Sequence, residues 1–238
     1  DLAENWSQWV KSVVLENEGD LVGITALRTE WVFEGFDLSK ELPWLVVIGI
    51  AMDFDEFSAA PSSDTDTRSA LEVADKYNQG ARCAAHLSNW IRGHGFNAKP
   101  HAGPWAGSIT LSPAAIEAGL GELGDHGNLI NDQYGSCFRL AAVSTDLPLV
   151  SDRPKQFGVD DYCMRCEACN NACPAGAIST EKQWVRGVEK YYVDFDKCLP
   201  YFNETHGCGI CLGVCPWSRP GVADKLVTKL AKQRQQND

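Results

Sequence analysis

Eight of the ten cysteines in this 238-residue chain lie within residues 163–215. The stretch CMRCEACNNACPAGAI at residues 163–178 holds the first four, with gaps of two, two and three residues and a proline directly after the last. This spacing wraps three thiolates around one iron–sulfur cluster and sends the fourth to a neighbouring cluster. The segment therefore predicts a pair of clusters. Its cysteines are Cys163, Cys166, Cys169 and Cys173.

A second set of four cysteines follows, and it also ends on a proline, Pro216. Its last three members keep the gaps of two and three residues found in bacterial ferredoxins. Its first member lies further upstream than that pattern requires, which we interpret as a loop insertion. Crosswise ligation then predicts two 4Fe-4S clusters. One takes Cys163, Cys166, Cys169 and Cys215, and the other takes Cys173, Cys198, Cys208 and Cys211.

Zinc and disulfides are the competing interpretations of these cysteines. A zinc ribbon needs paired C-x-x-C motifs, but it does not need three closely spaced cysteines followed by a fourth and a proline. Disulfides spread over the loops that need closing, whereas these cysteines gather in one region. Both alternatives are disfavoured. Cys83 and Cys137, outside the region, are predicted to be small buried residues.

Composition limits the possible partners. A formal net charge of -11 disfavours nucleic acid, because phosphate binding usually needs a basic face. No apolar run reaches the ~18 residues of a transmembrane helix. We expect a cytoplasmic protein. Because the chain begins at Asp1 rather than at Met, an exported protein stays open.

The first 157 residues are predicted to form an α/β domain. An amphipathic helix is expected over residues 2–17, strands over LVGITAL and LVVIGIAM, and a long helix over residues 66–93. Residues 97–108 read as a loop because they are rich in glycine and proline.

Shorter elements are expected after this loop. Ser112 is predicted to cap a short helix that Pro113 opens, and GNLI and FRLAAVSTDLPL are predicted strands. Residues 158–220 form the predicted cluster domain. Residues 221–238 are predicted to be a terminal helix that packs through Val222, Leu226 and Leu230, with a membrane or a reductase partner as the alternative.

Several stretches together resemble the cobalamin-dependent reductive dehalogenases. They are KYNQGARCAAHLSNWIRGHGF, AGLGELG, LINDQYGSCFRLAAVSTDLPL, RPKQFGVDDYCMRC and GCGICLGVCPW. AGLG, TDLPL and VCPW are also similar to epoxyqueuosine reductase, a tRNA-modifying enzyme. The resemblance implies an α+β chain in which a nitroreductase-like α/β domain binds base-off cobalamin and is fused to a two-cluster ferredoxin domain.

The resemblance also implies a catalytic pair. The family's tyrosine falls on Tyr77 and its partner arginine falls on Arg139. A guanidinium beside a phenol makes the phenolate less costly, so this pair suits proton donation. When the residues are considered without the resemblance, the alternative for Tyr77 is a core tyrosine and the alternative for Arg139 is a salt bridge at the end of a strand.

Corrin contacts are predicted in glycine-rich turns, on the basis of their position in loops and of the resemblance. The alternative is that these turns only reverse the direction of the chain. These candidates are Ser108, Ile109, Gly119, Gly121, Leu129, Ile130 and Tyr134. Where some dehalogenases place a substrate-polarising asparagine, this chain has Gly103, with Lys99 and His101 nearby as possible substitutes.

The resulting hypothesis is a reductase that cleaves a carbon–halogen bond in a small organohalide, with electrons passing from the clusters to cobalt. An external ferredoxin, flavodoxin or reductase is expected to supply the electrons. Two rivals stay open. One is an epoxyqueuosine-type reductase acting on a tRNA nucleoside, and the other is a cofactor-free docking domain joined to an electron-transfer module.

Overall fold

The computed structural model describes residues 2–36, 42–103, 107–185 and 187–237. It divides into two compact units, and each is built from three stretches of the chain. Unit 1 comprises Asp1–Ala51, Ala74–Leu120 and Phe138–Lys155, and unit 2 comprises Met52–Val73, Gly121–Cys137 and Gln156–Asp238. The functional boundaries expected at residues 157 and 220 stay predictions.

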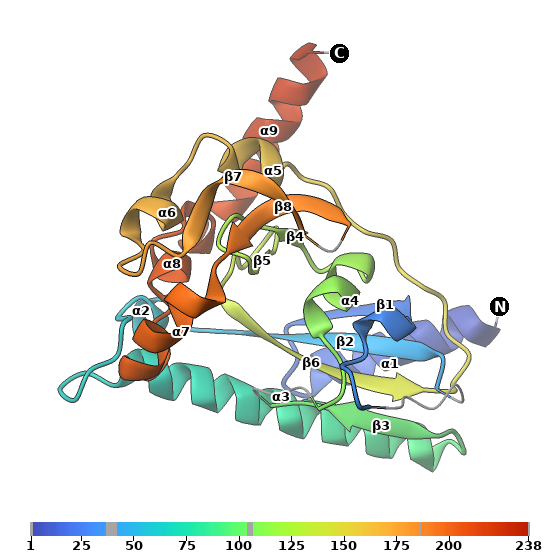
Figure 1. Ribbon diagram of the computed structural model, residues 1–238. Coiled ribbons are helices and arrows are strands. Elements are labelled where there is room, and N and C mark those ends of the chain that lie inside the picture. Colours follow the sequence, from blue (N-terminus) through green and yellow to red (C-terminus); the bar gives the residue numbers. More distant parts are fainter. Residues whose placement is uncertain (1, 37–41, 104–106, 186, 238) are drawn as a thin grey trace. The chain divides into compact units, whose positions relative to one another are not determined.

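Unit 1 is built on a four-stranded antiparallel sheet in the order β1-β2-β6-β3 (Figure 1). Its strands are β1 (Leu21–Ala26), β2 (Trp44–Ala51), β6 (Phe138–Thr145) and β3 (Ala98–His101). β2 is buried over nearly its whole length, as expected for a central strand that is covered on both faces. The two predicted N-terminal strands are confirmed.

Two strand predictions need correction. β3 lies within the segment that was predicted to be a loop, and it pairs with β6 at the edge of the sheet. An edge position tolerates Pro100, which lacks an N–H for a further neighbour, so the proline disguised the strand. β6 ends at Thr145, before the proline-containing end of the predicted strand. Residues 104–106 of the predicted loop lie outside the described residues.

Two helices cover one face of this sheet, α1 (Leu2–Glu16) and α3 (Arg68–Gly93), and both predictions are confirmed. Their apolar stripes meet the strand residues that point to that face. The core there includes Val10, Val14, Ile24, Val46, Ile48, Ile50, Ala84, Leu87, Ile91 and Val143. Cys83 belongs to the same core and is 2% exposed, as predicted.

The short helix α4 (Leu111–Glu117) lies against the opposite face, where a Cβ added to Gly23 would meet the Ala118 carbonyl. The predicted cap is wrong, because Thr110 occupies the N-cap position and Ser112 lies inside the first turn. The N–H groups of a first helical turn have no intrahelical partner, so Pro113 is tolerated there without having to open the helix.

Asp152 fastens the segment after β6 to the outer strand β1. Its Oδ2 accepts a hydrogen bond from the Ile24 N–H at 2.8 Å, and its own N–H donates to the Ile24 carbonyl at 2.8 Å. Its Oδ1 also binds Lys11 Nζ of α1 at 2.5 Å. One carboxylate therefore joins a helix, a strand and a connecting segment.

Unit 2 holds the cysteine-rich region and consists of short elements. Its strands form two hairpins, β4 (Glu122–Leu123) with β5 (Leu129–Ile130), and β7 (Ile178–Val185) with β8 (Val188–Val193). β5 lies in the predicted strand GNLI, whereas the β7–β8 hairpin was not predicted. The helices are α2 (Phe54–Phe57), α5 (Val159–Cys163), α6 (Ala168–Ala172), α7 (Phe195–Glu204), α8 (Ile210–Gly213) and α9 (Ala223–Asn237).

The loop insertion predicted between Cys198 and Cys208 is partly helical, because it includes the end of α7. α9 is the predicted terminal helix, and Leu226 and Leu230 pack into the unit's hydrophobic core as expected. None of the helices in the described part of the chain is long and apolar enough to cross a bilayer.

We expect Asp152→Ala to lower the free energy of unfolding by about 1–2 kcal/mol, because it leaves the Ile24 N–H without this acceptor and removes the ion pair with Lys11. Urea titration followed by tryptophan fluorescence measures this change. Glu30→Ala is the control, since its ion pair with Arg28 is 3.9 Å long and its side chain is 64% exposed. Equal losses in the two variants would contradict the proposed role of Asp152.

His101 makes the stability of the chain depend on pH. Its side chain is 2% exposed and its Nε2 lies 2.9 Å from Ser144 Oγ. Burial, with a smaller contribution from Lys99, lowers the pKa of His101 to about 4. The fold therefore favours the neutral imidazole. The contribution of the neutral imidazole to the free energy of unfolding is fully present above about pH 6.5. It is lost as the pH falls towards 4, because the unfolded chain then binds a proton that the folded chain does not.

Replacing His101 with Asn should remove this titration. Between pH 7 and about pH 4.5 we expect the wild type to lose about 2 kcal/mol more unfolding free energy than His101→Asn does. Urea titrations at several pH values measure both slopes. Buried His126 is present in both proteins, so its contribution cancels. Parallel pH profiles would refute the assignment to His101.

Candidate functional site

The eight cysteines of residues 163–215 lie in unit 2, and none of them forms a disulfide. Burial is the main cause of the raised pKa values of six of them, which are about 12 for Cys169 and Cys211 and about 11 for Cys215 and are also raised for Cys163, Cys198 and Cys208. Burial of this kind disfavours a bare thiolate. A thiolate at these positions needs compensating positive charge, which a bound metal centre supplies.

Charge interactions divide these thiols into two neighbourhoods. Cys163 and Cys169 each interact with Cys215, and Cys215 interacts with Cys166. Separately, Cys198 and Cys208 interact with Cys173, and Cys211 interacts with all three of those thiols. We name these groups set A (Cys163, Cys166, Cys169, Cys215) and set B (Cys173, Cys198, Cys208, Cys211). The strongest charge interaction of Cys211 is nevertheless with Cys169 of set A, so the two sets lie close together.

This division is the one expected from crosswise ligation, in which the last cysteine of each run joins the other run. A residue with positive φ precedes each of the helices α6 and α8, Glu167 (47°) and Gly209 (68°) respectively. These helices carry Cys169 of set A and Cys211 of set B. Among the described residues, no group of Cys, His, Asp and Glu is arranged to hold a single metal ion. The thiolates of a cubane bind four different irons, so they need not converge as the ligands of one ion do.

Backbone N–H groups also point at the sulfur atoms. The Ala177 N–H donates to Cys173 Sγ at 3.4 Å. Backbone hydrogen bonds lower the pKa values of Cys169, Cys208 and Cys215 against the larger effect of burial. Such donors stabilise a thiolate and tune the potential of an iron–sulfur cluster.

Glu122 was not singled out in the sequence, yet it holds the start of the cysteine region. Its Oε2 accepts hydrogen bonds from the backbone N–H groups of Phe157 (2.6 Å), Gly158 (2.9 Å) and Val159 (3.4 Å). Those residues lead into α5, which ends at Cys163. A carboxylate at the first turn of a helix satisfies N–H groups that would otherwise lack partners.

His126 forms a second network that the sequence did not reveal. The Asn128 N–H donates to His126 Nδ1 at 3.2 Å, so the ring proton lies on Nε2, which donates to Ser136 Oγ at 3.1 Å. Ser136 Oγ donates to the Leu129 carbonyl at 2.8 Å, and its backbone N–H donates to Ser218 Oγ at 3.2 Å. The network ties residues 126–136 to the turn after Cys215.

The predicted catalytic pair meets within unit 1. The Arg139 guanidinium carbon lies 5.7 Å from the centroid of the Tyr77 ring, a distance typical of a cation–π contact. β6 places Arg139 on the same face as Ala141 and Val143, which pack towards α3. α3 comes close to the sheet at Gly80, where an added Cβ would lie 3.3 Å from Ala141 Cβ. Tyr77 is one turn earlier on that helix, directly over Arg139.

The predicted corrin contacts fall in both units. Ser108, Ile109 and Gly119 belong to unit 1, and Gly121, Leu129, Ile130 and Tyr134 belong to unit 2. Ile109, Leu129 and Ile130 are buried. Ile130 packs with Cys163, Cys215 and Trp217, so its side chain has a structural role near set A. Tyr134 follows a turn in which its N–H donates to Asn131 Oδ1 at 3.0 Å.

The two predicted glycines are needed by the chain itself. Gly119 has φ +75°, and an added Cβ would lie 2.6 Å from the Arg153 carbonyl oxygen. A Cβ on Gly121 would lie 2.4 Å from the Ile130 carbonyl oxygen. Close backbone packing therefore requires both glycines, and their predicted contacts with a corrin stay predictions.

Ser108 retains a different signal. Its Oγ is buried and has no hydrogen-bond partner among the described residues.

Gly103, at the position where some dehalogenases have asparagine, has φ +81° and no described heavy atom within 4 Å of an added Cβ. Lys99 is exposed, whereas His101 is buried against Ser144. Cys137 is 3% exposed, as predicted.

Comparison with known proteins places these features in a family. Residues 162–218, which include all eight cysteines of sets A and B, match the 4Fe-4S dicluster domain family. Tetrachloroethene reductive dehalogenase of Desulfitobacterium hafniense is 31% identical over 79% of this chain and 35% of its own length. The tetrachloroethene reductive dehalogenase of Sulfurospirillum multivorans is 27% identical over 91% of this chain and 51% of its own length. The chain thus spans about a third to a half of these relatives.

Solved structures agree with this relationship. A catabolic reductive dehalogenase in complex with 3-bromo-4-hydroxybenzoic acid has a TM-score of 0.88 and 27% identity, over 99% of this chain and 35% of that one. A reductive dehalogenase whose structure suggests a mechanism for B12-dependent dehalogenation has a TM-score of 0.86 and 28% identity, over 96% of this chain and 34% of that one.

Epoxyqueuosine reductase shares the fold more distantly. The enzyme bound to a tRNA stem loop has a TM-score of 0.62 and 17% identity, over 90% of this chain and 65% of that one. The mixed α+β fold, the dicluster match and the relatives lead to one conclusion. The chain belongs to the reductive dehalogenase family, which is structurally related to epoxyqueuosine reductase, and it contains a 4Fe-4S dicluster domain.

Proposed function

We propose that the chain takes part in the reductive dehalogenation of a small organohalide, using base-off cobalamin and two 4Fe-4S clusters. Sets A and B are the proposed cluster ligands, and residues 1–157 are the proposed nitroreductase-like corrinoid domain. The contact between Tyr77 and Arg139 carries the proposal. These two residues were assigned by resemblance from distant parts of the sequence, and the fold brings them together.

The pair suits the proton step of this reaction. Replacing a carbon–halogen bond with a carbon–hydrogen bond consumes two electrons and one proton and releases halide. When bound, cobalamin supplies the reduced cobalt for cleavage of the carbon–halogen bond. Tyr77 donates the proton from its hydroxyl group, and Arg139 stabilises the phenolate that remains. Sets A and B would hold the two clusters, which would supply one-electron transfer from an external donor.

The fit of a corrinoid rests on two observations. Ser108 Oγ is a buried hydroxyl without a described partner, so it is available to hydrogen-bond a polar group of the cofactor. Both ring nitrogens of His126 are used within the chain, and His101 Nε2 is bound to Ser144. His126 is therefore not free to replace the lower base of cobalamin, which agrees with the base-off form without a histidine ligand.

The epoxyqueuosine-type rival has one observation in its favour. Epoxyqueuosine reductase of Cellulophaga algicola is 37% identical, although over only 44% of this chain. Its tRNA substrate class requires a basic surface, which the net charge of -11 disfavours. Binding of a tRNA anticodon stem loop in a filter assay separates this candidate from a dehalogenase.

Electron paramagnetic resonance tests the proposal directly. Protein reconstituted anaerobically with iron, sulfide and hydroxocobalamin should show a base-off cobalt(II) signal beside those of reduced clusters. Reduction with titanium(III) citrate in the presence of bromophenols, followed by halide measurement, then tests dehalogenation. Clusters without bound corrinoid would instead support an electron-transfer module.

Single cysteine variants should reveal crosswise ligation. We expect Cys173→Ala to remove the same cluster as Cys208→Ala, and Cys215→Ala to remove the same cluster as Cys166→Ala, because set membership crosses the sequence order. Iron content should fall by about half in each variant. Cys83→Ala is the control and should keep the full content. If Cys173→Ala removed the cluster lost in Cys166→Ala, the assignment would be wrong.

Tyr77→Phe should lower kcat for halide release by about 10²–10⁴-fold, because the variant lacks the hydroxyl that donates the proton. Iron content and the corrinoid signal should stay unchanged, since Phe keeps the ring over Arg139. Tyr192→Phe, at an exposed position on β8, is the matched control. A fully active Tyr77→Phe protein would exclude the proton-donor role.

A further inference from the structure

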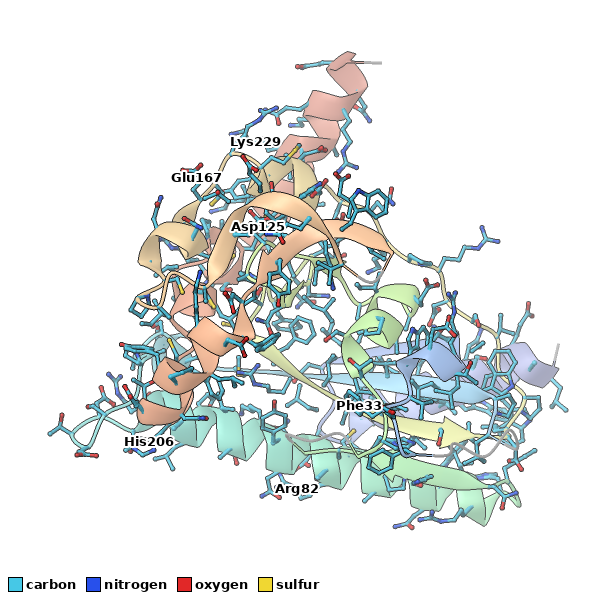
Figure 2. All side chains as sticks on the ribbon, in the orientation of Figure 1. Phe33, Arg82, Asp125, Glu167, His206 and Lys229 are labelled. Carbon is cyan, nitrogen blue, oxygen red and sulfur yellow. The ribbon has the colours of Figure 1, made fainter. Side chains whose placement is uncertain are left out.

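We propose that the outer face of α9 is the docking surface for a small acidic protein that delivers single electrons to the cluster of set A. This inference depends on the proposed function only in requiring that sets A and B hold reducible clusters. The argument uses the contacts of α9 within unit 2, its charges and the acidity of the chain. Figure 2 marks Lys229 on this helix.

The apolar face of α9 is already occupied. Ala223 and Leu230 are buried in the cluster of residues that contains Cys163, Cys215 and Trp217, and Leu226 and Val227 pack against it. At the start of α5, Gly158 lies against Leu230 and Arg234. The Arg234 guanidinium also pairs with Asp161 at 3.5 Å. One side of α9 thus forms the wall beside set A.

The other side of α9 is basic. Lys225, Lys229 and Lys232 recur at helical spacing, are exposed, and form no ion pair among the described residues. They line a shallow surface groove together with Asp224, Thr228 and Gln233. α9 carries four basic residues and one acidic residue, whereas the whole chain has a net charge of -11. Its outer face is therefore a local positive patch on an acidic protein.

The chemistry of this patch selects its partner. A membrane-binding helix needs a free apolar face, and that of α9 is buried within unit 2. Unpaired lysines attract an acidic protein, while the negative charge elsewhere repels it. The two effects together orient an acidic electron carrier on α9. Small one-electron carriers of the ferredoxin or flavodoxin class have this character.

Position makes the patch useful for electron transfer. An α-helix with its side chains is about 10–12 Å across, so a carrier on the outer face lies about one helix diameter from the shell of set A. In the transfer, the carrier's reduced centre loses one electron and the cluster gains it, with no bond made or broken. A second encounter supplies the second electron that dehalogenation requires.

Anaerobic stopped-flow mixing tests the proposal on the reconstituted holoprotein. The donor is a reduced acidic plant-type ferredoxin, and bleaching of the cluster absorbance is followed. At low ionic strength, Lys225→Glu/Lys229→Glu should slow the reduction by about 10–100-fold and weaken its salt dependence. The matched double variant Arg153→Glu/Lys190→Glu changes an exposed residue of the segment after β6 and a residue of β8, so it makes the same change in net charge outside α9 and should keep the wild-type rate.

Reduction by photoreduced deazaflavin, which needs no docking surface, should be equal in all three proteins. Equal slowing by ferredoxin in both double variants, or none in the α9 variant, would overturn the proposal. So would loss of binding to phosphatidylglycerol vesicles or to a tRNA stem loop in the α9 variant with an unchanged ferredoxin rate. Dehalogenation driven by deazaflavin tests the proposed function separately, because it bypasses α9.

Discussion

The gathering of eight buried and half-buried cysteines in unit 2 is the constraint on which the rest of that unit depends. Burial raises the pKa values of Cys169, Cys211 and Cys215, so a thiolate at these positions is costly until positive charge and hydrogen-bond donors compensate it. Short helices, positive-φ turns and backbone N–H groups surround the sulfur atoms for this reason. Glu122 and the His126 network hold those short elements where little regular secondary structure could do so.

In unit 1 the main feature is the close approach of the helix α3 to the strand β6. The antiparallel register sets Arg139 opposite Ile50, and alternation along β6 turns its side chain towards α3. Gly80 lets the helix approach the sheet, and Tyr77 follows from the helical repeat. The pairing thus depends on ordinary packing between a helix and a sheet. A shift of one residue in either strand would direct the guanidinium to the opposite face.

Departures within the family bear on specificity rather than on electron transfer. The cysteine sets, the tyrosine and the arginine are all present, whereas Gly103 supplies no side chain where some dehalogenases have an amide. Under the proposed function, this difference concerns the binding of the substrate and not the cysteine sets. The buried hydroxyl of Ser108, by contrast, concerns the proposed cofactor, because it is available to hydrogen-bond a polar group there.

Sequence by itself determined the ligand chemistry, because the cysteine gaps and the prolines after them are local features that survive without a fold. It also determined the long helices and the central strands, whose apolar periodicity is strong. β3 was hidden by its proline, and the β7–β8 hairpin and α7 by weak patterns. The membership of Cys215 in the set of Cys163 was predicted from the cysteine spacing, and the pair of Tyr77 and Arg139 from the resemblance. Only the tertiary structure showed the contact between Tyr77 and Arg139 and the hydrogen bonds by which Glu122 holds the approach to α5. Each of these contacts joins residues far apart in the chain, and long-range packing rather than local preference brings them together.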